Sequence, residues 1–543
     1  MIGVALGSSP AAARLSVSDT ARTYVQARAE AMSGNHARAA ELLAALSESQ
    51  PGQVEIARKA LGEAIGAGQM ELALNLTRNL PAASLPSDAR LLLAAAEIRR
   101  NRPDRANSWL AAKGEIGDLS FLVPLVTAWA AADRKQYEQA LSTLDAMGTT
   151  SLLGPMVTEE RAFILLKARR SAEAELLARQ VVGNAGAREQ RLRLAFADGF
   201  LAAGDRQRAL MIIEGMGAGE TAARQRISAG RSSGQAIDSL PRAFSEVITA
   251  FAADLTRLQR GTAPIGLVQV ARYANPQSSS TAALLALLLA SQDRTDEALA
   301  MLRSVPANDA LISQVRDVQT RILSDGKRLN EAYQVAATAT AASGADATDF
   351  SRLGDVLQSM KRHPQAADAY GRAITLAQAR DQKSLLWTLL LLRASALEDA
   401  DRWPEARSAL QQGLVIAPEQ PLLLNFMGYG QLERGENLDA AEAMIRKASE
   451  LAPDDASITD SLGWAQYKRG KVGEAITTLQ KAAEKDPDQA EIQEHLGDAL
   501  FISGRRYEAR FAWNAALVTA EDDIARRVKA KLVTGLTPAN AAP

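Results

Sequence analysis

The stretch ASITDSLGWAQYKRGKVGEAITTLQKAAEKDP, residues 456–487, contains one complete structural unit of this chain. Its apolar and small residues recur at helical spacing in two segments, and Gly470 between them marks a turn. Pro487 ends the second segment because proline cannot continue a helix and disfavours helix in the residue before it. The stretch therefore predicts two short helices joined by a turn, with the small residues Gly463 and Ala475 where the helices approach closely.

The alanine at position 475 has equivalents along almost the whole chain, at intervals of about 34 residues. The equivalent positions are Ala39, Ala73, Ala106, Ala140, Ala174, Ala209, Ala298, Ala332, Ala366, Ala406, Ala441 and Ala509, with Pro264 in the place of one alanine. A period of this size is typical of stacked two-helix units, each too small to bury its own apolar face. The sequence thus predicts an all-α solenoid of about fourteen stacked helix-turn-helix units.

The order of residue types within a unit resembles the tetratricopeptide repeat family. A Leu-Gly pair in the first helix is followed by an alanine, a bulky residue, a second alanine and a closing proline. In the quoted stretch these are Leu462, Gly463, Ala475, Leu479, Ala482 and Pro487. The resemblance covers roughly residues 20–520. It implies a right-handed superhelix whose concave inner face, lined by the first helices, binds peptides or helices of partner proteins.

The repeat is interrupted once, which divides the chain into two arrays. The interruption is rich in glycine and serine and is predicted to be a flexible loop with a short helix near residues 222–227. The resulting division is a signal-peptide remnant or disordered tail at 1–19, six repeats at 20–213, the insert at 214–243, eight repeats at 244–520, and a capping helix with a disordered tail at 521–543.

Composition excludes several classes of function. The chain has 62 basic and 63 acidic residues, a net charge of -1, so it has no electrostatic reason to bind nucleic acid. Cysteine is absent, which rules out disulfides and cysteine-based zinc sites. No apolar run approaches the ~18 residues of a membrane span. We therefore expect protein partners, with no nucleic acid, no small-molecule substrate and no transmembrane span.

No motif in the sequence predicts an enzyme. Residues 230–234 match the serine-hydrolase pattern G-x-S-x-G, but that motif requires a strand before the serine and none is predicted here. His495 is expected on an exposed helical face, without the three convergent ligands of a metal site. The sequence accordingly predicts no catalytic residue, no cofactor and no metal.

The candidate binding residues lie on the inner face that the resemblance implies. Large rings on such a wall can act as rigid anchors for a bound peptide, and polar neighbours can add specific contacts. The aromatic candidates are Trp129, Tyr429, Trp464, Tyr467 and Phe501, and the polar candidates are Asn425, Asp460 and Lys468. The alternative is that some of these rings pack between adjacent repeats.

The expected function is a non-enzymatic interaction scaffold or assembly factor. Its last repeats also resemble those of proteobacterial envelope-associated tetratricopeptide proteins, and residues 8–13, SSPAAA, resemble the end of a secretory signal. These features favour a periplasmic or outer-membrane-associated protein. The alternative is a cytoplasmic regulatory or sensor module that controls a partner enzyme.

Overall fold

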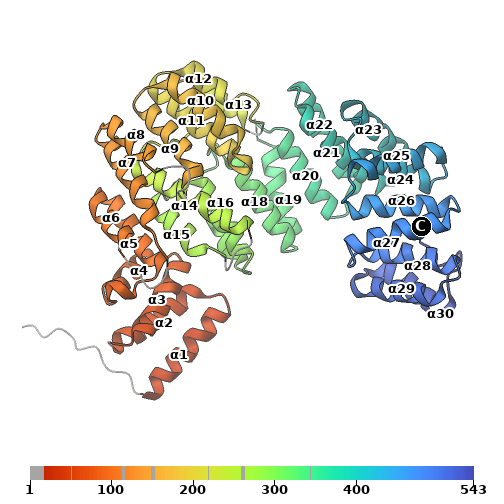
Figure 1. Ribbon diagram of the computed structural model, residues 1–543, viewed down its shortest axis with the longest axis horizontal. Coiled ribbons are helices and arrows are strands. Elements are labelled where there is room, and N and C mark those ends of the chain that lie inside the picture. The colour runs from red at the N-terminus through yellow and green to blue at the C-terminus, as the bar shows by residue number, and fades with distance from the viewer. Residues whose placement is uncertain are drawn as a thin grey trace, which may run out of the picture. The chain divides into compact units, whose positions relative to one another are not determined.

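The computed structural model describes residues 17–50, 52–112, 117–147, 153–217, 219–258, 263–342 and 344–542. The predicted signal remnant therefore lies almost wholly outside the described residues. Over the described part of the chain the regular secondary structure is helical, without a β-strand (Figure 1). The chain forms two compact units, Met1–Gly344 and Ala345–Pro543, called unit 1 and unit 2 below.

Unit 1 consists of helices with three single-turn 3-10 segments between them. Its helices are α1 Val17–Met32, α2 His36–Ser49, α3 Val54–Gly66, α4 Met70–Thr77, α5 Ser87–Arg99, α6 Pro103–Ala111, α7 Val123–Asp133, α8 Tyr137–Asp145, α9 Gly154–Lys167, α10 Ser171–Gly183, α11 Glu189–Ala203, α12 Arg206–Ile212, α13 Glu220–Ser228, α14 Leu240–Arg257, α15 Ile265–Ala274, α16 Ser279–Ala290, α17 Thr295–Arg303, α18 Ile312–Asp325 and α19 Leu329–Thr340. The 3-10 segments are η1 Ala82–Ser84, η2 Ser120–Leu122 and η3 Gly186–Arg188.

Unit 2 continues in the same manner and ends in a single unpaired helix. Its helices are α20 Ala347–Ser359, α21 His363–Ala379, α22 Lys383–Glu398, α23 Trp403–Ile416, α24 Pro421–Glu433, α25 Leu438–Leu451, α26 Ala456–Lys468, α27 Val472–Lys485, α28 Ala490–Ile502, α29 Arg506–Thr519 and α30 Asp522–Thr534. Each helix packs mainly on its neighbours in sequence, so both units are α-solenoids built from consecutive helix pairs.

Small residues decide how closely the helices of a pair approach. In the pair α26–α27, Ala475 and Leu479 are fully buried, and Leu479 faces Gly463 of the first helix. A Cβ atom at Gly463 would lie 2.6 Å from Leu479 Cγ, well inside van der Waals contact. The Leu-Gly and alanine positions of the repeat are therefore requirements of helix–helix packing.

The turn between the two helices of a pair places one residue in the left-handed region. Gly470 has φ 76° before α27, and Lys361 has φ 58° at the same place before α21. The second helix then begins two residues later, and the residue in between is often arginine. In five pairs this arginine bonds to a glutamate three residues further on, as in Arg170–Glu173, Arg294–Glu297, Arg328–Glu331, Arg402–Glu405 and Arg505–Glu508. The pair ties the turn to the first turn of the second helix.

The inner face of the first repeats in unit 1 is filled by the chain itself. Helix α15 packs against α3 and α5, and α14 packs against α5 and α7. Arg191 of α11 donates to the carbonyl oxygen of Gln235 at 2.6 Å and lies 3.1 Å from Glu246 of α14. The first helices of these repeats therefore bury their inner side against a later pair of the same chain.

The glycine- and serine-rich insert contains the short helix that the sequence predicts, but the segment after this helix differs from the predicted flexible loop. The helix is α13, and the segment after it is pinned to α11 by Asp198. The Asp198 carboxylate accepts hydrogen bonds from the Ser233 backbone N–H at 2.6 Å, the Ser233 hydroxyl at 2.8 Å and the Gln235 backbone N–H at 2.8 Å. Ser233, Gln235 and Ile237 are each 4% exposed, so this segment is part of the core.

The C-terminal tail is also ordered, contrary to its predicted disorder. Asn540 closes a turn by accepting from Thr537 N–H at 2.7 Å and donating to the Gly535 carbonyl oxygen at 2.9 Å. Ala542 is 5% exposed, and its N–H donates to Asp498 of α28 at 3.1 Å. The tail therefore packs back onto the first helices of unit 2. No helix in the described residues combines the length and apolar composition that a membrane crossing needs.

Candidate functional site

Four successive first helices of unit 2 line a pocket of about 440 Å³. Helix α22 contributes one wall, α24 the centre, α26 the opposite wall and the start of α28 the far rim. The lining residues are Leu391, Leu392, Ser395, Leu422, Asn425, Phe426, Tyr429, Ser457, Asp460, Ser461, Gln489 and Glu491. This is the face on which the resemblance placed the binding groove.

Helical spacing explains why these side chains meet. Residues four apart lie on one face of a helix, so Leu422, Phe426 and the neighbouring Asn425 and Tyr429 form a single stripe on α24. Leu422 is 45% exposed, although leucine is usually buried. The predicted residues Asn425, Tyr429 and Asp460 are all brought together in this pocket.

The polar part of the pocket is acidic. Burial raises the pKa of the Tyr429 hydroxyl above its usual range, and the negative charges of Glu433, Glu491, Asp460 and Glu398 raise it further. Glu491 is exposed at the rim, but the surrounding protein displaces part of its hydration and raises its pKa above the ordinary value. The charges of Asp460 and Glu494 act in the same direction, and His495 and Arg527 oppose them.

Beside the pocket, Trp464 is the centre of a stack of three rings. Its ring centroid lies 4.6 Å from that of Tyr467 and 4.0 Å from that of His495, and both pairs are nearly parallel. Trp464 is 1% exposed, so it is core and not a groove anchor. The predicted role of Trp464 is thus corrected: its ring packs between the repeats.

His495 is buried as well, where the sequence predicted an exposed face. It is 1% exposed, and its Nδ1 lies 2.9 Å from Asp460 Oδ2. Burial disfavours the imidazolium, but the carboxylates of Asp460, Glu491 and Asp498 together outweigh this effect, so the pKa of His495 lies above its ordinary value. The pair holds Asp460 in place at the wall of the pocket.

Tyr467 and Phe501 are half-buried, and the C-terminal tail packs beside them. Leu536 of the tail joins the apolar cluster that both rings contact, and Gly535 lies directly against the Phe501 ring. Ala542 belongs to the apolar cluster that contains Trp464. The C-terminal tail therefore covers part of the rings of both predicted anchor residues.

Lys468 remains exposed at the end of α26. Its Nζ lies 5.3 Å from the centre of the Trp464 ring and 3.9 Å from Glu433 Oε1. Lys468 is outside the pocket lining.

Trp129, the one predicted residue of unit 1, is fully buried and cannot contact a partner. Its Nε1 donates to Glu160 Oε2 at 2.6 Å. Burial, and next the negative charge of Glu159, raises the pKa of Glu160 well above its ordinary value. The prediction for Trp129 is corrected because α14, packed against the inner side of α7, helps close that face.

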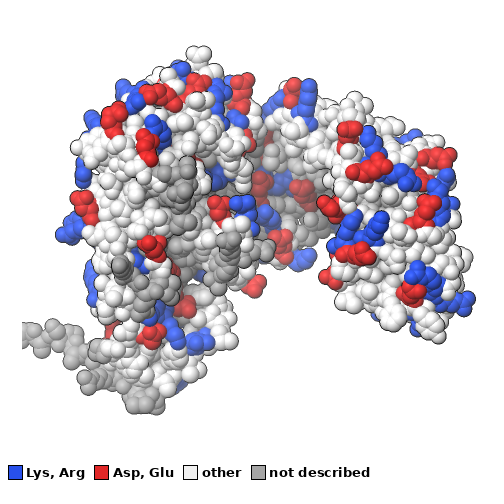
Figure 2. Space-filling model, in the orientation of Figure 1, with Lys and Arg blue, Asp and Glu red and all other residues white. Residues whose placement is uncertain are grey.

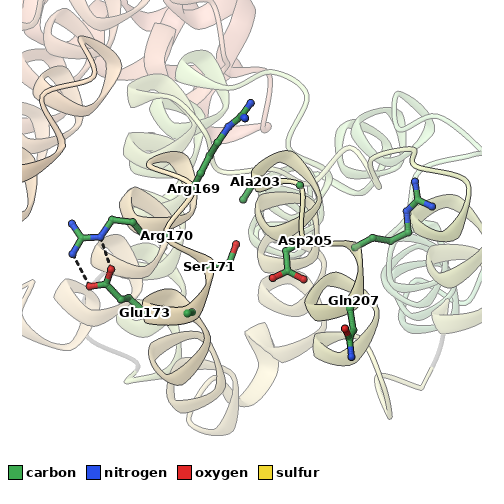
Figure 3. Close-up of a pocket in the computed structure, with 10 residues that line it drawn as sticks. Arg169, Arg170, Ser171, Glu173, Ala203, Asp205 and Gln207 are labelled. Carbon is green, nitrogen blue, oxygen red and sulfur yellow. Dashed lines mark hydrogen bonds and ion pairs between the residues drawn. The ribbon is translucent and has the colours of Figure 1, made fainter.

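A second cavity, of about 540 Å³, lies in unit 1 at the turns that precede α10 and α12 (Figure 3). Its labelled side chains are largely charged, and Arg170 is bonded to Glu173 at 2.6 Å. The same Arg–Glu pair occurs at the start of other second helices. It is therefore a feature of the repeat and does not indicate a binding site. On the face shown in Figure 2, acidic and basic residues are interspersed in both units. The pocket of unit 2 is therefore the better candidate.

Sequence reasoning missed the apolar wall of that pocket. Leu391, Leu392, Leu422 and Phe426 fit the apolar stripe of a helix, so their spacing does not distinguish a groove from a core. A signal was present in α24, where PLLLNFMGYG is apolar on all sides. A helix that packs on one side only has no need of such a sequence.

The fold and the pocket define an α-helical repeat protein with an open site on its first helices. Residues 463–504 match the family model described as TPR repeat. The matched residues contain the end of α26 and all of α27 and α28, so the match shows a tetratricopeptide repeat in this part of the chain.

Several solved structures are similar to the chain. One is the crystal structure of the APC/C hetero-tetramer Cut9–Hcn1, with 13% identity, a TM-score of 0.39, and 96% of this chain and 97% of that chain covered. A tetratricopeptide repeat protein from Parabacteroides merdae has 16% identity, a TM-score of 0.38, and 47% and 98% covered. YrrB, described as a TPR protein with an unusual peptide-binding site, has 18% identity, a TM-score of 0.27, and 36% and 97% covered. No curated protein matches the chain.

Proposed function

We propose that this protein is a non-enzymatic interaction scaffold that binds an extended segment of a partner protein in the pocket of unit 2. Tetratricopeptide repeats are generally protein-interaction modules without catalytic activity, and the chain carries such a repeat at 463–504. The observation that carries the proposal is the exposed apolar wall, with Leu422 at 45%, in one pocket with polar groups that include the unsatisfied Asn425 Oδ1. Such a mixture of apolar surface and a few convergent polar groups is typical of binding sites.

Photo-crosslinking in the native host tests this function. The probe replaces Ser457 at the exposed rim of the pocket in the full chain, and a control probe replaces Glu484, exposed on the second helix α27. We expect a partner adduct at position 457, none at 484, and loss of the adduct when Leu422→Glu is added. Adducts of equal yield at both positions would contradict the proposal.

We further propose that the protein acts as an assembly factor in the bacterial envelope. The support is the narrower resemblance of the last repeats to envelope-associated proteins. Fractionation of the host, followed by protease treatment of intact spheroplasts, tests this location. Protection from protease inside the spheroplasts would favour the alternative, a cytoplasmic module that regulates a partner enzyme.

A further inference from the structure

The pocket of unit 2 has carboxylates but no cationic side chain. None of the described residues that line it is lysine, arginine or histidine, whereas Asp460 and Glu491 both line it. Glu433, on the same face of α24 as Tyr429, adds a third negative charge close to the Tyr429 hydroxyl. A ligand that enters this pocket therefore meets negative potential from three helices.

The cations near these carboxylates leave one of them unpaired. Asp460 is bonded to His495 at 2.9 Å, and the nearest cation to Glu433 is Lys468, whose Nζ lies 3.9 Å from Oε1. The side chain of Glu491 has no hydrogen bond or ion pair within the described residues, although the positive charges of His495 and Arg527 act on it. Glu491 is exposed at the rim of the pocket, so its carboxylate is accessible to a cation of a partner.

Two of the unsatisfied polar atoms near this pocket are acceptors. Asn425 Oδ1 and Glu433 Oε1 are buried and accept no hydrogen bond from the described residues. A buried acceptor without a donor costs free energy that a donor from a ligand would recover. Lysine and arginine side chains bring three and five N–H donors respectively and no acceptor, so they match this set.

The apolar wall fits the rest of such a side chain and its neighbours. Leu391, Leu392 and the exposed Leu422 lie across the pocket from the carboxylates of α26 and α28. The methylene stem of a long cationic side chain packs on apolar surface while its charged end reaches a polar group.

We infer that the pocket of unit 2 binds a cationic side chain, lysine or arginine, of an extended partner segment in which apolar residues flank the cation. Glu491 is its ion-pair partner, with Asn425 Oδ1 as a further acceptor, and Leu422 and Phe426 hold the flanking residues. This inference rests on the proposed function and adds the chemistry of the partner to it.

Fluorescence anisotropy with the full chain tests the inference. The probes are labelled heptapeptides of sequence GALXLAG in which X is arginine, lysine, glutamine or glutamate. We expect the arginine and lysine peptides to bind about tenfold or more tightly than the glutamine peptide. The glutamate peptide should bind weakest, and added salt should reduce the preference for the cation.

A pair of variants tests whether Glu491 causes the preference for the cationic peptides. Glu491→Gln should abolish most of the difference between the arginine and glutamine peptides, whereas Glu484→Gln on the outer helix α27 should preserve it. Asp460 stays unchanged because it holds the buried His495. Thermal melts of both variants, expected to match the parent chain, exclude loss of fold as the cause.

Each contrary result has a distinct meaning. If all four peptides bind equally and Leu422→Glu weakens them all, the scaffold function stands and the cation inference is overturned. If arginine preference survives Glu491→Gln, the assignment to this pocket is overturned. Absence of binding by every peptide at millimolar concentration would contradict the inference and the peptide-binding function together. A dimer that Leu422→Glu dissociates would show a second copy as the occupant, which also overturns the inference.

Discussion

At the scale of single residues, Gly463 shows why this fold repeats small side chains. A methyl group there would lie 2.6 Å from Leu479 Cγ and 2.8 Å from its Cδ2, both in a fully buried side chain. We expect Gly463→Ala to reduce the free energy of unfolding by about 1–3 kcal/mol through overpacking. Urea denaturation followed by circular dichroism measures this change.

The matched control is Gly473→Ala in α27. Gly473 is helical and has open space around it, so alanine there should stabilise the protein by about 0.5–1 kcal/mol. Equal stability of the two variants would show that α26 and α27 have room to separate, and it would contradict the close contact.

The buried His495 predicts a pH dependence of stability. Its pKa is raised above the ordinary 6.5 by Asp460, with Glu491 and Asp498 acting in the same direction, so the folded chain holds a proton that the unfolded chain releases. The resulting stabilisation is complete below about pH 6.5 and is lost as the pH rises through the folded pKa. We expect the stability difference between the parent chain and His495→Gln to shrink over that interval. Denaturation at a series of pH values measures it, and a difference that grows with pH would contradict the assignment.

At the scale of elements, the C-terminal tail covers α28, which is the first helix of the last helix pair. It packs on Phe501 and gives one backbone hydrogen bond to Asp498, which also holds Lys531 at 2.7 Å. Removal of residues 535–543 should reduce the stability of unit 2 by about 1–3 kcal/mol, from lost apolar burial and a lost bond to a buried carboxylate. Hydrogen exchange should then accelerate in α28 and α30.

Asn540→Ala provides the milder control for that truncation. It removes the bonds within the tail turn and leaves the Ala542 N–H and Gly535 in the chain. Its effect should be smaller than that of truncation. Unchanged exchange in α28 after truncation would show that the tail does not cover this helix.

The helix pairs could be predicted from the sequence because the signal is local. The alanine period and the Leu-Gly positions reflect contacts between the two helices of a pair. The residues that make these contacts are close together in the sequence. The insert and the tail could not be predicted this way: Ser233 is held by Asp198, and Ala542 by Asp498, so distant residues order segments whose own composition resembles a loop. The same distinction applies to the residues of the candidate site. Asn425, Tyr429 and Asp460 follow from the first-helix positions, whereas the burial of Trp129 depends on α14, which no repeat pattern reveals.

At the scale of the whole molecule, the two units use the same inner face differently. In unit 1 the first helices α3, α5 and α7 pack against α14 or α15 of the same chain. In unit 2 the corresponding helices leave a pocket of about 440 Å³ with an exposed leucine. The inner sides of α3, α5 and α7 are thus used for packing within unit 1, whereas α22, α24, α26 and α28 of unit 2 leave an open pocket, to which we assign the proposed binding.

This division predicts that damage to the core of unit 1 stays within unit 1. Arg191 and Glu246 form a buried ion pair at 3.1 Å, with side chains 7% and 5% exposed. Removal of Arg191 leaves the buried Glu246 with Arg188, at 3.1 Å, and leaves the Gln235 carbonyl oxygen without this donor, so Arg191→Met should destabilise unit 1 by about 1–3 kcal/mol. Hydrogen exchange should accelerate in α11 and α14 and stay unchanged from α22 to α28. The exposed pair Arg179–Glu175 supplies the control, since Arg179→Met should cost at most about 1 kcal/mol. Equal acceleration in both units would mean that the chain unfolds as one cooperative body, and binding at unit 2 would then depend on the packing of unit 1.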